Sequence, residues 1–193
     1  MTDISSIQRK WDSRYAQAHV GAPARVLSEN AYLLPESGEA LEVACGMGGN
    51  AVFMAQHGLD VHAWDISQVA VKKLQEYALG EKLTLIAEVR DSVQDPPAEN
   101  SFDVIVVSHF LDRSLMPFLI HALKPEGLLF YQTFSKLKVD DSGPSNPDFL
   151  LGDNEMLELC KALRTVVYRE EQTIGDVSKG YRNLVNYVGQ KKT

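Results

Sequence analysis

The stretch FDVIVV at Phe102–Val107 ends in four consecutive β-branched residues. Such a run is typical of a strand that helices cover on both faces, because neither face then has to present polar side chains to water. Apolar runs of strand length alternate with amphipathic stretches along the chain, which predicts a mostly parallel sheet with helices on both faces. With 193 residues the chain is close to the size of one compact domain, so we expect a single α/β domain over residues 1–193.

The boundaries of the elements follow from apolar periodicity and from glycine, proline and serine signals. Helices are expected from Gly49 to Gly58, from Ser67 as N-cap to about Leu79 with Gly80 as terminator, after Ser114 as N-cap, and at 155–162. Strands are expected at 40–44, 60–65, 83–87, 102–107 and, after a turn at Lys124–Gly127, at 128–134. Two final runs, 165–172 and 182–189, predict an antiparallel ending.

Residues 135–154 interrupt this alternation, with the turn-rich stretch KVDDSGPSNPD. A loop of this length in a compact domain usually covers a site or is disordered. We expect it to be a lid.

Charge and cysteine content restrict the function. A net charge of -7 and an isoelectric point near 5.2 argue against nucleic acid as a partner. Cys45 and Cys160 show no paired spacing and no accompanying metal-ligand pattern, so neither a disulfide framework nor a metal site is expected. The N-terminus lacks the apolar core of a signal peptide, and no apolar run approaches the roughly 20 residues that cross a bilayer. We therefore expect a cytoplasmic protein without a membrane partner.

The glycine-rich loop after the first expected strand leaves two ligands open. Gly46, Gly48 and Ala51 satisfy the G-x-G-x-x-[GA] pattern of dinucleotide sites, and Asp65 follows at a distance that suits a ribose hydroxyl. The same loop and the helix after it also suit an amino acid carboxylate, because glycines allow close approach and the helix offers free N–H groups. Glu42 disfavours a nicotinamide oxidoreductase, because a dinucleotide strand is normally apolar at that position.

The order of several motifs resembles the class I S-adenosylmethionine-dependent methyltransferases, and among them the small TehB-like enzymes, over nearly the whole chain. EVACGMGGN resembles the first motif of the family, and HAWDIS resembles the second. RDS stands where the family contacts adenine, and VVSHF stands at the fourth motif, beside the reactive methyl. KPEGLLF is similar to the usual K-P-G-G turn. WDSRY resembles an element that closes over the cofactor, so residues 1–30 are expected to cover it.

This resemblance implies a Rossmann-like, seven-stranded fold with an antiparallel C-terminal strand. It also implies S-adenosylmethionine as cofactor, S-adenosylhomocysteine as product and a small-molecule methyl acceptor, in a monomer or weak homodimer. Glu42 could instead be a structural carboxyl group, and Arg14 could be solvated at the surface. The cofactor-binding residues that the resemblance implies are Arg14, Tyr15, Glu42, Ala44, Gly46, Gly48, Asn50, Asp65 on the ribose, Ile66, Asp91, Ser92, Ser108 and Phe110.

The acceptor is expected at the carboxyl ends of the strands, where open α/β sheets bind ligands. His109 and Arg113 could hold an anionic acceptor by charge-assisted hydrogen bonds, and they are the expected catalytic residues. Further candidates are Phe110, Asp112, Gln132 and Thr133.

The class of acceptor stays open. TehB-like enzymes carry a histidine and arginine pair near the last strand, whereas GDVSKGYRN keeps only Lys179 and Arg182 as basic residues. Tellurite or selenite and a small thiol are therefore equal contenders. A nicotinamide oxidoreductase and a non-catalytic S-adenosylmethionine-binding module are the alternative functions.

Overall fold

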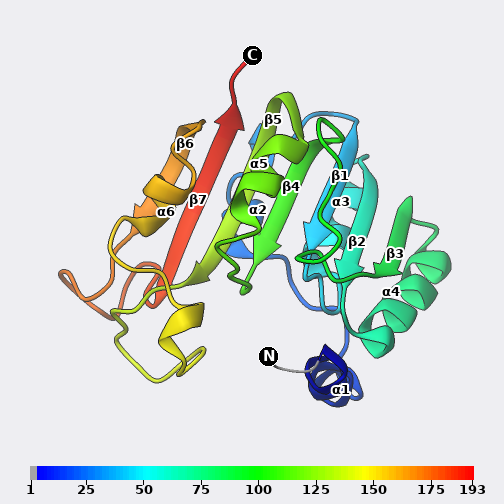
Figure 1. Cartoon of the computed structure of the whole chain (residues 1–193), viewed down its shortest axis with the longest axis horizontal. Coiled ribbons are helices and arrows are strands. Elements are labelled where there is room, and N and C mark those ends of the chain that lie inside the picture. The colour runs from blue at the N-terminus through cyan, green and yellow to red at the C-terminus, as the bar shows by residue number, and fades with distance from the viewer. Residues whose placement is uncertain (1–3) are drawn as a thin grey trace.

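A single seven-stranded sheet organises the chain in the computed structural model, which describes residues 4–193 (Figure 1). The strand order is β3-β2-β1-β4-β5-β7-β6. Among the described strands, β7 is antiparallel to both of its neighbours, β5 and β6, and all other neighbouring pairs are parallel. The predicted fold class is thus confirmed, including the antiparallel C-terminal strand. The strands are β1 Glu39–Val43, β2 Asp60–Asp65, β3 Leu85–Val89, β4 Phe102–Ser108, β5 Leu123–Phe134, β6 Leu163–Glu170 and β7 Leu184–Lys191.

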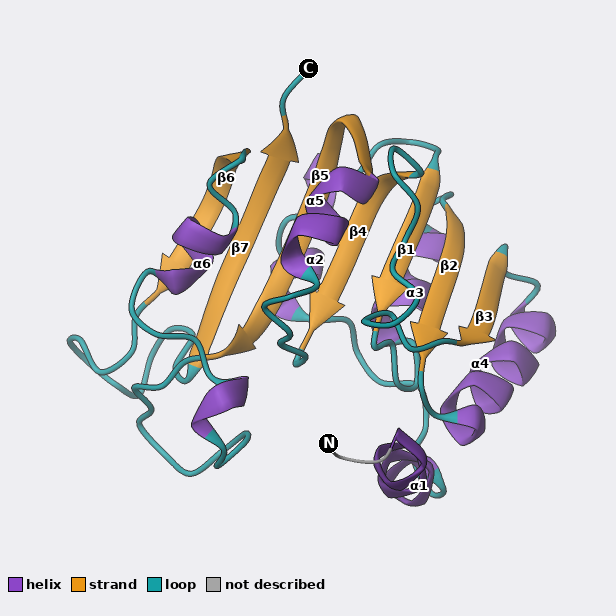
Figure 2. Cartoon of the chain, viewed as in Figure 1, coloured by secondary structure: helices purple, strands orange, loops and turns teal. Residues whose placement is uncertain are grey.

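Helices cover both faces of this sheet, and Figure 2 shows α5 and α6 on its near face. The helices are α1 Ile4–Tyr15, α2 Arg25–Ser28, α3 Gly49–Gln56, α4 Gln68–Glu81, α5 Met116–Ala122 and α6 Glu155–Leu159, with 3-10 turns at Ala31–Leu33 and Pro147–Phe149.

The β-branched run in β4 lies at the centre of both cores. Val104 and Val106 pack into the core that contains α2, α3 and α4, and Ile105 and Val107 pack into the core that contains α5 and α6. All four side chains are fully buried. Because successive side chains of a strand point to opposite faces, a continuous apolar run is what a strand between two helix layers requires.

The second predicted helix is correct at its start and wrong at its end. The Ser67 side chain accepts a hydrogen bond from Ala70 N, as expected of an N-cap. The helix α4 continues through Gly80 to Glu81, and Lys82 at φ 56° ends it in the left-handed conformation. This extension moves β3 two residues beyond the predicted 83–87.

Ser114 is not the N-cap of α5, which was a second wrong expectation. Leu115 occupies the N-cap position without a side-chain cap, and Asp112, two residues before Ser114, accepts hydrogen bonds at Oδ1 from Ser114 N at 2.8 Å and Leu115 N at 3.3 Å. Aspartate side chains bond the backbone two residues on readily, so this turn competes with a serine cap. The helix therefore begins only at Met116.

Several other boundaries also differ from the predicted ones. The expected turn at Lys124–Gly127 lies inside β5, where Glu126 at φ 66° accompanies a shift in the pairing with β4. The helix α6 ends at Leu159, not Ala162, and β6 begins two residues early, because Leu163 N already bonds Cys160 O. The strand β7 spans Leu184–Lys191 instead of 182–189. The helix α1 was not predicted at all.

The loop 135–154 is closed at its base. Ser135 forms a bridge with Leu151, and Lys136 N donates to Leu151 O at 2.8 Å. The buried Asn183 side chain accepts from Val139 N at 2.6 Å. These bonds tie the loop to the end of β5 and the start of β7.

The carboxyl ends of the parallel strands meet at one edge of the sheet, and α1 lies beyond that edge (Figure 1). The loops that follow β1, β2, β3 and β4 therefore converge there. Within residues 4–193, no helix combines the length and the apolar character that crossing a membrane requires.

Candidate cofactor site

Three residues in the left-handed conformation shape the loop after β1. Ala44, Gly46 and Gly48 have φ values of 53°, 51° and 74°. A Cβ atom on Gly48 would lie 2.4 Å from the Leu74 side chain, and one on Gly46 would lie 2.7 Å from the Tyr15 hydroxyl. The two glycines thus permit both the turn and the close packing of α1 and α4 around it.

Asn50 connects three segments that are distant in sequence. Its Nδ2 donates to Glu42 Oε1 at 2.7 Å and to Ser108 Oγ at 3.0 Å, while its Oδ1 accepts from Ala24 N at 2.7 Å. The neighbouring Gly49 has no room for a Cβ, which would lie 2.8 Å from Ala22 O. The segment before α2 therefore packs directly on the start of α3.

Glu42 is buried, and both of its carboxyl oxygens accept hydrogen bonds. Besides Asn50, the backbone N–H of Ala51 donates to it at 2.7 Å. Burial raises the pKa of Glu42 to about 8, against the opposing effect of these two hydrogen bonds.

The raised pKa of Glu42 predicts a pH dependence of stability. Because the folded protein holds this proton more tightly than the unfolded chain, its stabilising effect is complete below about pH 4.5 and is lost as the pH rises through about 8. Between about pH 6 and pH 7.5 we expect the free energy of unfolding to fall by about 2 kcal/mol more in the wild type than in Glu42→Gln. Urea unfolding of both proteins at several pH values measures this, and parallel pH profiles would contradict it.

The Asp65 side chain bonds the backbone of two loops, the one after β1 and the one after β2. Its Oδ2 accepts from Gly46 N at 2.7 Å and its Oδ1 accepts from Ser67 N at 2.8 Å. It is 5% exposed, and burial is the largest cause of its raised pKa. Each oxygen keeps a lone pair for a further donor. Ile66 follows it, half-buried, at the start of the loop.

The N-terminal helix α1 is held over this edge by two polar side chains. Asp12 Oδ1 accepts from Ser67 Oγ at 2.6 Å and from Val69 N at 3.1 Å. Lys73 Nζ donates to the carbonyl oxygens of Tyr15 at 3.0 Å, Ala16 at 2.6 Å and Ala18 at 3.1 Å. Tyr15 consequently lies on the glycine loop, and burial raises the pKa of its hydroxyl.

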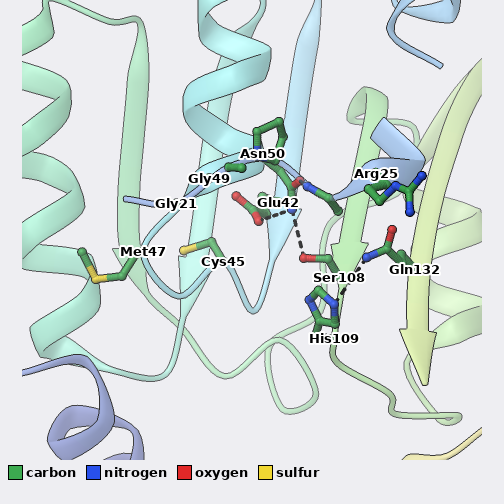
Figure 3. Close-up of a pocket in the computed structure, with 14 residues that line it drawn as sticks. Gly21, Arg25, Glu42, Cys45, Met47, Gly49, Asn50, Ser108, His109 and Gln132 are labelled. Atoms are coloured by element: carbon green, nitrogen blue, oxygen red, sulfur yellow. Dashed lines mark hydrogen bonds between the residues drawn. The ribbon is translucent and has the colours of Figure 1, made fainter. Parts of the chain in front are cut away.

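A cavity of about 350 Å³ opens between these loops (Figure 3). Of the predicted site residues, the structure brings five into its wall, namely Glu42, Gly48, Asn50, Ser108 and His109. The rest of the wall was not assigned residue by residue: residues 21–25 lie in the segment 1–30 that was expected to cover the cofactor, Gln132 was an acceptor candidate, and three residues belong to the EVACGMGGN motif without an individual role. That part of the wall consists of Gly21, Ala22, Pro23, Ala24, Arg25, Cys45, Met47, Gly49 and Gln132.

The other predicted residues lie outside this wall. Arg14 is exposed and stacks on Trp11, with 5.3 Å from its Cζ to the ring centroid. Asp91 and Ser92 follow β3, where Asp91 Oδ1 accepts from Val93 N at 3.0 Å. Phe110 is half-buried after β4, and its carbonyl oxygen accepts from the Tyr131 hydroxyl.

The His109 ring has a defined orientation in the cavity wall. Gln132 Oε1 accepts from Val26 N at 3.1 Å, which leaves its Nε2 to face His109 Nε2 at 3.3 Å. An amide NH₂ group only donates, so His109 Nε2 is the acceptor and the proton of the neutral ring resides on Nδ1. Partial burial lowers the pKa of His109, which favours this neutral form.

Arg113, the other expected catalytic residue, is not brought into the cavity. Its Nε donates to Glu155 Oε1 at 2.5 Å, and its Nη atoms donate to the carbonyl oxygens of Asp148 at 2.6 Å and Leu150 at 3.0 Å. The guanidinium group thereby fastens the loop 135–154 to α6.

Comparison with known proteins agrees with this geometry. Residues 40–127, which contain the glycine loop, Asp65 and β4, match the sequence profile of a family described as methyltransferase domain. Residues 40–127 of this chain thus resemble a methyltransferase domain. The fold of the chain is shared with solved structures of methyltransferases.

Three proteins illustrate the relatives of this chain. The chain is 25% identical over 151 residues to the probable S-adenosyl-L-methionine-dependent methyltransferase TehB of Haemophilus influenzae, covering 75% of this chain and 52% of TehB. The TehB crystal structure superposes with a TM-score of 0.71 at 20% identity, over 96% of this chain and 67% of that one.

The second relative is the ubiquinone biosynthesis O-methyltransferase of Xanthomonas axonopodis pv. citri, 31% identical over 66% of this chain and 57% of its own length. The third is the geranyl diphosphate C-methyltransferase of Streptomyces coelicolor, solved with S-adenosyl-L-homocysteine, with a TM-score of 0.71 and 13% identity over 99% of both chains. The chain thus spans about half the length of the curated relatives it matches.

Proposed function

We propose that the protein binds S-adenosylmethionine in the cavity at the carboxyl ends of β1 and β4 and transfers its methyl group to a small soft nucleophile. The observation that carries this proposal is the combination of the glycine loop with two buried carboxyl groups, Glu42 and Asp65, on either side of it. Backbone N–H donors of the loop suit the carboxylate of an amino acid at one end of a ligand, and carboxyl oxygens that accept hydrogen bonds suit ribose hydroxyls at the other.

Each part of the proposed cofactor site has a physical role. The left-handed glycine loop lets the ligand approach the backbone and the start of α3. A cationic group of the ligand next to the buried Glu42 would favour the ionised form of this carboxyl group, whose pKa burial otherwise raises. Asp65 accepts hydrogen bonds from the ribose, Tyr15 and the segment Gly21–Arg25 cover the site, and Asp91 and Ser92 bind the adenine.

Positioning supplies much of the rate in such a transfer. The bound cofactor provides a methyl group on a sulfonium. When the methyl is transferred to the nucleophile, the sulfur departs as a neutral thioether. Holding the nucleophile in line with that methyl is worth up to roughly 7–11 kcal/mol. His109, with its proton on Nδ1, donates a hydrogen bond that orients an acceptor oxygen or sulfur atom.

The protein's own thiol nearest the site is a poor nucleophile. Burial raises the pKa of Cys45 well above its ordinary value, so the reactive thiolate is scarce at neutral pH. A thiolate or chalcogen oxyanion that enters as substrate is nucleophilic without a general base. We therefore propose selenite, tellurite or a small thiol as the acceptor, with the loop 135–154 as a cover over it.

Incubation with S-adenosylmethionine labelled in its methyl group tests this proposal. The acceptors compared are selenite, tellurite, small thiols and thiopurines, with His109→Ala as the matched variant. We expect transfer to at least one of them and a decrease of about tenfold or more in His109→Ala. Tight cofactor binding without transfer to any acceptor would favour a non-catalytic S-adenosylmethionine-binding module.

A further inference from the structure

A second cavity, of about 150 Å³, lies beside the first, between α2 and the strands β6 and β7. The hydrogen bond from Val26 N to Gln132 Oε1 stands between the two, because Val26 lines the second cavity and Gln132 lines the first. A molecule in the second cavity is therefore separate from the cofactor. Its volume suits several water molecules or one small organic group.

Asn186 in the wall of this cavity is an unpaired buried amide. It is 4% exposed, and neither Nδ2 nor Oδ1 has a hydrogen-bond partner within the described residues. In the sheet it pairs with Gln132 of β5 and Arg169 of β6. Buried amides in folded proteins are nearly always bonded, so an unpaired one needs an explanation.

Asn183, three residues earlier, shows the usual behaviour. It is 3% exposed, and its Oδ1 accepts from Val139 N while its Nδ2 donates to Asp140 and Ser142. The two asparagines have the same size and nearly the same burial. They differ in whether the protein itself satisfies the amide.

Groups of both charges surround the unpaired amide. The guanidinium groups of Arg25 and Arg169 both stack on the Tyr181 ring, and their Cζ atoms lie 3.9 Å and 4.2 Å from its centroid. Arg169 bonds Glu171 through Nε, and Glu29 in the cavity wall pairs with Arg25 through Oε1. The remaining N–H groups of Arg169 and the second oxygen of Glu29 are left for other partners.

We propose that this second cavity binds a small α-amino carboxylate. The carboxylate accepts from the guanidinium of Arg169 and from Asn186 Nδ2, and the ammonium donates to Asn186 Oδ1 and Glu29. A zwitterion matches a wall with one cation, one anion and an amide that offers a donor and an acceptor. The amide is covered from solvent, so the ligand reaches it by a shift of Arg169, whose side chain is 45% exposed. This site goes beyond the proposed methyl transfer.

Titration of the full, isotope-labelled chain with glycine and L-alanine tests the site, followed by NMR at the Asn186 side-chain amide. No cofactor is added, so failure here and failure of methyl transfer are distinguishable. We expect saturable shifts with both amino acids and weaker ones with acetate or methylamine, which each carry half of the zwitterion. Arg169→Met is expected to weaken glycine binding about tenfold.

Melting temperatures of two matched variants provide the second measurement. Asn186→Leu removes an unpaired buried amide and is expected to raise the melting temperature by roughly 2–4 °C, while Asn183→Leu breaks three bonds and is expected to lower it. A fall in both variants, or the absence of any shift at Asn186 with glycine, would overturn the proposal.

Discussion

Replacing Asn50 by leucine is expected to lower the free energy of unfolding by about 3–5 kcal/mol. The substitution leaves three groups without their partner, namely Ala24 N, one oxygen of Glu42 and the Ser108 hydroxyl. Each buried polar group that loses its hydrogen bond costs about 1–3 kcal/mol. For a domain of this size the melting temperature should fall by roughly 6–20 °C.

The control for this variant is Asn30→Leu. Asn30 is half-buried, and its Nδ2 makes one bond to a backbone oxygen, Val26 O at 2.9 Å. We expect a loss of about 1 kcal/mol or less there, because water can replace that bond. Thermal unfolding of the two variants side by side compares their losses in free energy of unfolding. Equal losses would show that Asn50 does not organise the site.

The second large effect is expected on ligand binding. Replacing Asp65 by alanine should weaken S-adenosylmethionine binding by about 1–3 kcal/mol, which is roughly 5- to 150-fold in Kd. The carboxylate would lose its bonds to the ribose and would also release Gly46 N and Ser67 N, which it holds in place. Calorimetric titration gives the Kd, and thermal unfolding of the same sample shows how much of the loss comes from the loop.

Asp65→Asn separates these two contributions. The asparagine oxygen can still accept from one of the two backbone N–H groups, while its NH₂ group can no longer accept from a ribose hydroxyl or from the other N–H. An intermediate affinity is expected. An affinity for S-adenosylmethionine that is unchanged in both variants would remove Asp65 from the ribose site.

Features that depend on neighbouring residues could be predicted from the sequence. The run VIVV in β4 reports burial on both faces by itself, and Ser67 caps α4 through a bond to a residue three positions away. The glycine loop is equally local, because left-handed backbone at Gly46 and Gly48 follows from residue type. These signals predicted the fold class, which is confirmed, and indicated where a candidate site should lie.

Contacts between distant segments could not be predicted in this way. Ala24 meets Asn50, and Val26 meets Gln132 across 106 positions, so the expectation that residues 1–30 cover the cofactor could not single out residues 21–25 as the part that lines the cavity. The helix α1 has no buried residue, and Asp12 and Lys73 hold it through polar bonds that leave no apolar stripe in the sequence.

The role of Arg113 could not be predicted for the same reason, because its contacts come from a distant segment. An arginine after a central strand suits an anionic acceptor, but its partners come from residues 148–155, which only the folded loop brings close. The residues of the cofactor loop are therefore easier to predict than those that meet the acceptor.

Binding of S-adenosylmethionine to the purified wild-type protein, measured by calorimetry, tests the central claim most directly. We expect saturable binding with one site per chain, competition by S-adenosylhomocysteine, and no comparable binding of NAD. Absence of saturable S-adenosylmethionine binding, or preferential binding of NAD, would contradict the assignment of the cavity beside Glu42 and the glycine loop as the cofactor site.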